Sequence, residues 1–513
     1  MSLLGNTRRK WLALAIAPWP YCLASCATVE HADEIGQAAQ QLRATSGLES
    51  RWSVDTELQV LQLNEEGALP LDRAVELGLA NNRSLRADLE QIASAKADLV
   101  QAGLLSNPIL SFMVRFPEGG GRASLDFGLS KDIADLWLIP SRKRTAQRML
   151  QRTILSFTDG AVGLVNEIKS TYFALHYQAT AIELQTRNLQ VLRETLELAQ
   201  ARFRAGDSSQ LDVNLTRGRL IEAELELLTL RSALGATQRN LLRLIGVADF
   251  PGEWKSLAVA APALPSVEGE SVIVNTALER RLDVQAAWWE VEAAVAEVEQ
   301  QRRRVIPFFG LGISGERPER RAMPGRNILA DTVRSSVREG QLTAPEIQSR
   351  SERRRERSAE IDLILGPSIE VPLPIFDQNQ AQVAKAQARA RELKQRYEET
   401  QQRVIEGVRT ALHVYRLANE RARLFRESLL PQQEANLRFA EKSYQSGQEN
   451  ILTVLLAQEA LIRSQVGAAT AERDWAVGAA NLERQLGGRI PGFLLGTEEP
   501  AGEGKAPDRT DGN

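Results

Sequence analysis

The chain repeats one order of elements twice, and this internal duplication limits the folds that it can adopt. A shift of 199 residues lays apolar and small residues of the first half over similar residues of the second: Leu85, Ala87, Ala95, Ala97, Leu99 and Pro108 over Val284, Ala286, Ala294, Ala296, Val298 and Pro307. A shift of 241 does the same for Phe203, Gly206, Leu211 and Val213 over Tyr444, Gly447, Leu452 and Val454. Each half is therefore predicted to hold a helix, a Pro-started apolar segment, a long helix, a Gly turn and a returning helix.

The predicted long helices carry apolar residues at heptad spacing. In the first half these are Ile182, Leu189, Leu192, Leu196, Ala199 and Phe203, with Leu220, Ala223, Leu227, Leu230 and Leu234 on the return; in the second they are Val383, Ala386, Ala390, Leu393, Tyr397, Thr400 and Val404. This spacing predicts coiled-coil packing. The pattern covers 141–205 and 378–446, and some 65 residues of helix extend about 100 Å. A soluble coiled-coil scaffold would show the same seams.

Prolines mark two interruptions of this pattern. Pro431 falls inside the second long helix, where it should remove a backbone hydrogen bond and produce a kink or a local bulge. The stretch 247–270 is rich in Pro and Ala and is predicted to be a linker between the halves.

Four segments between the helices alternate apolar and polar residues, which predicts strands. Their apolar members are Leu110, Phe112, Val114 and Phe116; Leu125, Phe127 and Leu129; Phe309, Leu311 and Ile313; and Ile369, Val371, Leu373 and Ile375. One apolar and one polar face suit a wall between lipid and water. A soluble hairpin would show the same alternation.

The strands cannot form a membrane wall within one chain. No stretch of 18 apolar residues occurs, so an ordinary membrane-spanning helix is excluded. Unpaired strand edges in hydrocarbon would each cost several kcal/mol per group, and about eight strands are the fewest that close. The expected fold is mainly α with a small β part: long antiparallel coiled-coil helices forming a periplasmic α-barrel, and four strands per chain in a trimeric, twelve-stranded transmembrane β-barrel. The charged insertion 315–362 is expected to be an extracellular loop, with lipopolysaccharide binding by its arginines as the alternative.

The N-terminus is typical of a targeting segment. Arg8, Arg9 and Lys10 precede a short apolar run, and the sequence Leu23-Ala24-Ser25-Cys26 follows it. This sequence resembles the bacterial lipobox, which predicts residues 1–25 as a signal peptide and Cys26 as the lipid-modified residue, carrying palmitate-type chains. Cleavage would remove three positive charges and no negative one, which changes the formal charge from -3 to -6. An ordinary signal peptide with an incidental cysteine is the alternative.

The sequence offers no catalytic or metal-binding constellation. His31, His176 and His413 are scattered, and no metal-ligand spacing is present. The run 310–315 satisfies G-x-G-x-x-G, but a charged loop follows it where a dinucleotide site needs a helix. With 63 basic and 66 acidic side chains, nothing in the charge favours nucleic acid. The chain is therefore predicted to be no enzyme and to need no cofactor.

Several motifs, in duplicated order, resemble the TolC-like outer-membrane efflux proteins. They are Leu71-Asp72-Arg73-Ala74-Val75, Asn107-Pro108, Phe203-x-x-Gly206, Leu211-Asp212-Val213, Pro372-Leu373-Pro374-Ile375-Phe376-Asp377, Tyr444-x-x-Gly447 and Leu486-Gly487. The resemblance covers about 70–488. It implies a homotrimeric barrel over a periplasmic helical tunnel, docked by a membrane-fusion adaptor and powered by an inner-membrane pump of the RND type.

The resemblance also implies positions for the narrow end of the tunnel. Family members often carry acidic residues there, and the matching places here are Thr453 and Leu456. We therefore expect Thr453 and Leu456, together with Asp212, to form the constriction, because an apolar ring can gate by dewetting. The alternative is that Leu456 is a coiled-coil core residue. The turns at Gly206 and Gly447 are the expected adaptor-docking tips.

These expectations divide the chain into ordered parts. A lipid-anchored segment at 26–70 precedes the first repeat at 71–246; the linker at 247–270 leads to the second repeat at 271–488, and 489–513 is a disordered tail. The predicted function is a passive outer-membrane channel component of a tripartite efflux pump. The alternative is a lipid-tethered periplasmic coiled coil without channel activity.

Overall fold

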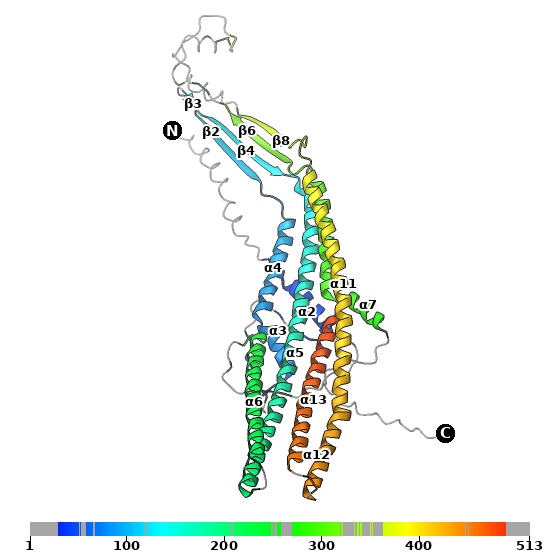
Figure 1. Ribbon diagram of the computed structural model, residues 1–513. Helices are drawn as coiled ribbons and strands as arrows, with labels where there is room; N and C mark the ends of the chain where they lie inside the picture. Colours follow the sequence, from blue (N-terminus) through cyan, green and yellow to red (C-terminus); the bar gives the residue numbers. More distant parts are fainter. Residues whose placement is uncertain are drawn as a thin grey trace, which may run out of the picture. The chain divides into compact units, whose positions relative to one another are not determined.

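The computed structural model describes residues 29–488 apart from short gaps, at 51, 53–57, 65–66, 117, 119–120, 207–208, 248–249, 251–253, 258–268, 319, 322–332, 334–335, 338, 341–348, 350, 352–362, 447 and 450. The chain forms two compact units, each drawn from several segments (Figure 1). Unit 1 comprises Met1–Asp98, Arg148–Val291 and Leu393–Asn513, and unit 2 comprises Leu99–Gln147 and Glu292–Glu392. Neither predicted repeat coincides with one unit, because both units take residues from both halves of the chain.

Helices make up most of unit 1. They are α2 (Ala32–Ser46), α3 (Leu71–Asn81), α6 (Gln210–Leu244), α7 (Glu270–Arg280), the π-helix η1 (Phe425–Leu429), α12 (Leu430–Gln445) and α13 (Ile451–Gln485). Four more helices lie partly in each unit: α4 (Arg83–Gly103), α5 (Asp135–Ala205), α8 (Leu282–Arg303) and α11 (Gln380–Leu424). None of the described helices has a segment apolar and long enough to cross a membrane.

The helix bounds show the two offsets found in the sequence. Helices α3 and α7 have the same length and lie 199 residues apart, and α6 and α13 both have 35 residues and lie 241 apart. In each half, a glycine of positive φ just after the last helix lies against the C-terminal end of the first helix. Gly246, with φ 73°, lies against the backbone of Asn81, and Gly487, with φ 80°, lies against Arg280 and Arg281.

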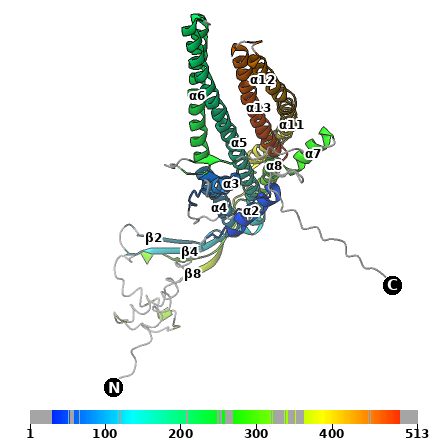
Figure 2. The ribbon, with the colours of Figure 1, turned by 90° about the horizontal axis from the view of Figure 1, so that it is seen from below.

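The predicted heptad seam between α5 and α6 is confirmed. Leu189 and Leu192 of α5 pack with Ala223 and Leu227 of α6 in one buried cluster. In Figure 2 this pair and the pair formed by α12 and α13 are seen as separate hairpins of unit 1. In the second half the buried cluster combines α7, α8, α11 and α13, with Val408, Ala479 and Leu482 almost inaccessible.

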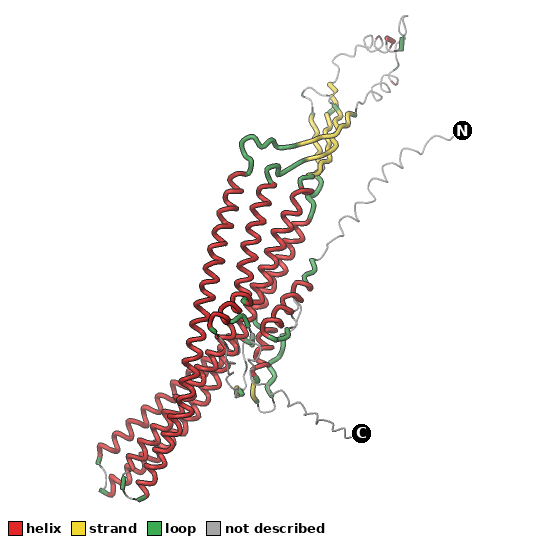
Figure 3. Tube along the Cα trace, turned by 90° about the vertical axis from the view of Figure 1, so that its right-hand side faces the viewer, coloured by secondary structure: helices red, strands yellow, loops and turns green. Residues whose placement is uncertain are grey.

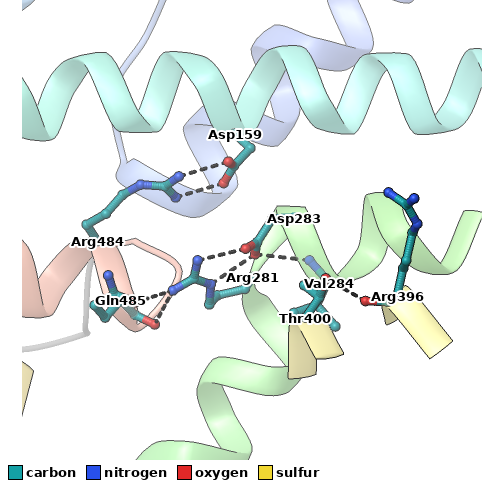
Figure 4. Close-up of polar contacts among 8 residues, drawn as sticks. All are labelled: Asp159, Arg281, Asp283, Val284, Arg396, Thr400, Arg484 and Gln485. Carbon is teal, nitrogen blue, oxygen red and sulfur yellow. Dashed lines mark hydrogen bonds and ion pairs between the residues drawn. The ribbon is translucent and has the colours of Figure 1, made fainter. Parts of the chain in front are cut away.

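A polar junction at the C-terminal end of α13 joins the two halves within unit 1 (Figure 4). We call it the clasp and define it by Glu483, Arg484 and Gln485 with their partners. Arg484 donates two hydrogen bonds to Asp159 of α5, at 2.7 and 2.8 Å. Glu483 forms a buried ion pair of 2.7 Å with Lys169, and Gln485 accepts a hydrogen bond from Arg281.

Charge pairing sets the ionisation of the clasp. Burial alone would raise the pKa of the Asp283 carboxyl, but hydrogen bonds and charge from Arg281, and the charge of Arg484, hold this pKa below its ordinary value. Burial alone would lower the pKa of Arg484, but its bonds to Asp159 raise it. Because removal of one partner from such a pair leaves the other charge desolvated, the clasp is a fixed point of unit 1.

Unit 2 contains one antiparallel sheet in the order β2-β4-β6-β8. Its strands are β2 (Ile109–Arg115), β4 (Ser124–Asp132), β6 (Gly310–Arg317) and β8 (Ile364–Glu370), drawn in yellow in Figure 3. Two-residue strands also occur: β3 (Gly121–Arg122) pairs with β7 (Arg320–Arg321) in unit 2, and β1 (Ala68–Leu69) pairs with β5 (Lys255–Ser256) in unit 1.

The predicted fourth strand was wrong in its C-terminal part, although Ile369 does lie in β8. Val371, Leu373 and Ile375 lie beyond the end of β8, which begins at Ile364. Pro372 and Pro374 lack the N–H that a strand ladder requires, so the pairing stops before them. The charged insertion also begins later than predicted, because β6 continues through Arg317.

Gly246→Ala tests the close approach at the end of the first half. A Cβ at this position would lie 2.5 Å from the Asn81 carbonyl oxygen, and the backbone has positive φ. We expect the substitution to destabilise the protein by roughly 1–3 kcal/mol, measured as a lower thermal unfolding midpoint by circular dichroism. Gly218→Ala is the matched control, since a Cβ at that helical position meets nothing within 4 Å. An unchanged midpoint for Gly246→Ala would show that the contact is unimportant.

Candidate functional site

One face of the sheet in unit 2 is apolar, as the alternation predicted. The register places apolar residues side by side across the strands: Leu110 opposite Leu129, Phe112 opposite Phe127, Leu129 opposite Ile313, and Leu311 opposite Ile369. Leu110 and Phe112 are 70% and 68% exposed. An apolar face of this extent needs a covering that the described residues of one chain do not supply, such as lipid or another chain.

The opposite face of the sheet carries the charged residues, together with Ile109, Met113 and Ile364. It carries Arg115, Asp126, Glu316 and Glu370, and a 2.9 Å ion pair joins Arg115 to Asp126. The sheet ends at β2 on one side and at β8 on the other. The outer backbone groups of these two strands are therefore available to pair with further strands.

A cluster of polar side chains in unit 2 fixes the first turns of α5, next to the sheet. The carboxylate of Asp135 accepts hydrogen bonds from the backbone N–H of Ser106, at 2.6 Å, and from Arg142, at 2.7 Å. Burial alone would raise the pKa of Asp135, but these bonds hold it below its ordinary value. The cluster joins the segment before β2 to the helix after β4.

The first hairpin end of unit 1 is the turn between α5 and α6. Gly206 has φ 85°, in the left-handed region that favours glycine. Asp212 and Ser209 form a capping box at the start of α6, with 3.0 Å from the Ser209 N–H to the Asp212 carboxylate. Asp212 is exposed, and this cap gives it a structural role in the chain.

The second hairpin end joins α12 to α13 and lies at the same end of unit 1 as the first (Figure 1). Thr453 donates a hydrogen bond of 2.9 Å to Glu449 and occupies the third position of α13, as Asp212 does in α6. Leu456 is 45% exposed, whereas Val454 is buried. Gly447 lies outside the described residues.

Cys26 lies outside the described residues. Where it is described, the segment that follows packs against α3 and α4 in the same unit: Lys96 forms a 2.6 Å ion pair with Glu34 of α2, and the Trp52 indole donates to the Leu79 carbonyl at 3.0 Å. The described residues contain no group of three or more side chains suited to hold a metal ion.

Sequence reasoning missed two groups of residues. The contacts of the clasp could not be predicted from local sequence patterns, because Asp159 and Arg484 are separated by 325 positions. Phe425 also has a partner that was not foreseen, Gly467 of α13, although Pro431 signalled an irregularity close by.

Comparison with known proteins gives the family. The family profile described as "outer membrane efflux protein" matches residues 74–247 and 273–488. The pyoverdine export outer membrane protein OpmQ of Pseudomonas putida is 24% identical, over 82% of this chain and 86% of that protein. The cobalt-zinc-cadmium resistance protein CzcC of Cupriavidus metallidurans is 22% identical, over 78% of this chain and 85% of that protein.

Solved structures support the same fold. The channel CusC aligns with a TM-score of 0.63 and 17% identity, covering 86% of this chain and 97% of CusC. The outer membrane protein VceC of Vibrio cholerae aligns with a TM-score of 0.60 and 20% identity, covering 82% and 96%. Because the family profile matches most of both halves, the chain belongs to the outer membrane efflux protein family and is an outer-membrane efflux channel component.

Proposed function

We propose that three copies of this chain form one conduit, with the sheets closing into a twelve-stranded barrel and the helices into a tunnel beneath. The observation that carries the proposal is the amphipathic sheet with open edges at β2 and β8. Closing the sheet with strands of neighbouring copies would pair both edges, and lipid would cover the apolar face.

Exposed apolar residues on the helices support the same assembly. Helix α6 exposes Leu211, Leu215, Leu225 and Leu228, and α11 exposes Val414, Leu417 and Leu424. Such rows at helical spacing are suited to pack against helices of a neighbouring copy. A lipid-tethered coiled coil without channel activity would need the apolar rows on the helices. It would not need a sheet with one apolar face.

The conduit is passive in this proposal, and the chain performs no enzymatic reaction. A periplasmic adaptor would dock at the hairpin ends, including the turn at Gly206, and an RND-type inner-membrane pump would supply the energy. The relatives OpmQ and CzcC are named for pyoverdine export and for cobalt, zinc and cadmium resistance. Because such different cargoes use this fold, we propose that the pump selects the cargo.

Reconstitution tests the conduit directly. The mature protein should migrate as a trimer in detergent, measured by light scattering, and should conduct ions in planar lipid bilayers. Charged substitution of an exposed residue on the apolar sheet face, Phe112→Asp, should reduce insertion because a charge there would face hydrocarbon. A stable monomer without conductance in lipid would reject the proposal.

We propose that Leu456, with Thr453 and Asp212, narrows the tunnel near the hairpin ends. Nearly half of the Leu456 side chain is uncovered within the chain, so copies of it are able to form an apolar ring. Leu456→Ala should raise single-channel conductance roughly twofold. Leu198→Ala, at a leucine of α5 that is 37% exposed, should leave conductance unchanged. If Leu456→Ala behaves like this control, Leu456 does not restrict the current.

We also propose that acyl chains on Cys26 anchor the mature protein in the outer membrane. Cys26→Ser should abolish incorporation of an alkyne-tagged palmitate in growing cells. Cys22→Ser is the matched control, because Cys22 lies in the predicted signal peptide, and it should leave labelling intact. Labelling that persists in Cys26→Ser would exclude this residue as the anchor.

A further inference from the structure

The helix that runs from α11 into α12 contains one π-helical turn, η1. The backbone N–H of Leu430 donates to the carbonyl oxygen of Phe425, five residues earlier. A turn of this kind contains one residue more than an α-helical turn. Pro431 follows directly. Because proline has no N–H and its ring would clash with the carbonyl four residues earlier, the wider turn relieves that clash.

Phe425 is the half-buried residue of this turn, and the other four are exposed. Its ring lies against α13 at Gly467. A Cβ at Gly467 would lie 2.8 and 2.9 Å from two carbons of the Phe425 ring, Cε1 and Cζ. The ring therefore occupies a notch that exists because residue 467 has no side chain.

Burial differs on the two sides of this turn. Before it, Val404, Val408, Leu412 and Tyr415 of α11 are buried in a cluster with α7, α8 and α13. After it, α12 contains one buried residue, Ala440. No residue from 423 to 439 is buried, and the structure describes all of them. Segments with so few buried contacts open at low free-energy cost.

Weak contacts surround the turn. Arg426 lies 3.5 Å from Glu472, and its guanidinium lies 5.8 Å from the centre of the Trp475 ring; Arg421 lies 3.6 Å from Asp474. The charged partners are all more than a third exposed. Exposed ion pairs of this kind add little stability, so they permit small changes in helix direction.

The clasp lies at the opposite end of α13 from the hairpin end. Arg484 and Glu483 hold that end of α13 to α5 through two ion pairs. One part of the hairpin is thus anchored, whereas the part beyond η1 is held by few buried residues. We define this second part as the arm, residues 430–445 and 451–466.

We propose that η1 is a hinge about which the arm bends, and that Phe425, seated against Gly467, is the positioning residue for Thr453 and Leu456. Bending would move the part of α13 that carries both residues while the clasp stays in place. The consequence for the constriction rests on the proposed function, whereas the hinge itself does not.

Hydrogen exchange of the full-length trimer, followed by mass spectrometry, tests the hinge. Amides of the arm should exchange at least about tenfold faster than those of 404–418. Deleting Ser428 together with Pro431→Ala should convert η1 to α-helix while keeping the register on both sides. In this variant arm exchange should slow toward the rate of 404–418, whereas Pro431→Ala alone should keep the contrast. Equal exchange in the wild-type arm and in 404–418 would overturn the proposal.

A second pair of variants does not depend on rebuilding the helix. Phe425→Ala empties the notch and should speed exchange of the arm severalfold without changing 404–418. Phe439→Ala removes an aromatic ring that is 70% exposed on the arm and should change neither region. If both substitutions have the same effect, Phe425 has no positioning role.

Bilayer recordings test whether bending at the hinge changes the constriction. Wild-type channels and Pro431→Ala should switch between conductance levels, and the deletion variant should lose this switching. Switching that persists in the deletion variant would overturn the link between hinge and constriction. Absence of conductance in every variant would reject the proposed function, and the exchange measurements would then decide the hinge alone.

Discussion

Backbone hydrogen bonding at the two outer strands is the constraint on which the assembly depends. A single chain builds four strands, with β2 and β8 at the edges, and in an apolar environment their free N–H and C=O groups are costly. The apolar rows that run from Leu110 to Ile369 demand such an environment. Both requirements are met together when further strands continue the sheet, which is why the proposed trimer is argued from the sheet more directly than from the helices.

The helical unit is held together in two different ways. Along α5 and α6, apolar residues at heptad spacing pack in a seam that is repeated along the helices. At the junction of the two halves, ion pairs of the clasp join α13 to α5. Buried ion pairs contribute modest net stability but penalise other arrangements strongly. The heptads therefore supply packing, and the clasp selects one register between the halves.

Much of this fold was predictable because it follows from local chemistry. The offsets of 199 and 241 residues reappear in the bounds of α3 and α7 and of α6 and α13. The position of β8 was not predicted, because alternation continues past Glu370 while Pro372 and Pro374 stop the pairing. Contacts between distant residues left no periodic signal: neither the pairing of Arg484 with Asp159 nor the notch at Gly467 is visible in the sequence.

Glycines of this chain allow two kinds of close contact, which differ in whether the neighbouring atoms belong to backbone or to a side chain. Gly246 and Gly487 have positive φ and touch backbone atoms of Asn81 and Arg280, so rigid groups meet there without room to move. Gly467 is helical, and a Cβ at this position would meet the ring of Phe425. The backbone contacts fix the end of each half to the start of the same half, whereas at the proposed hinge an aromatic ring lies against a helix face that has no side chain. In our proposal the second copy of the duplicated helical hairpin has a bending point at the π-helical turn, which Pro431 follows.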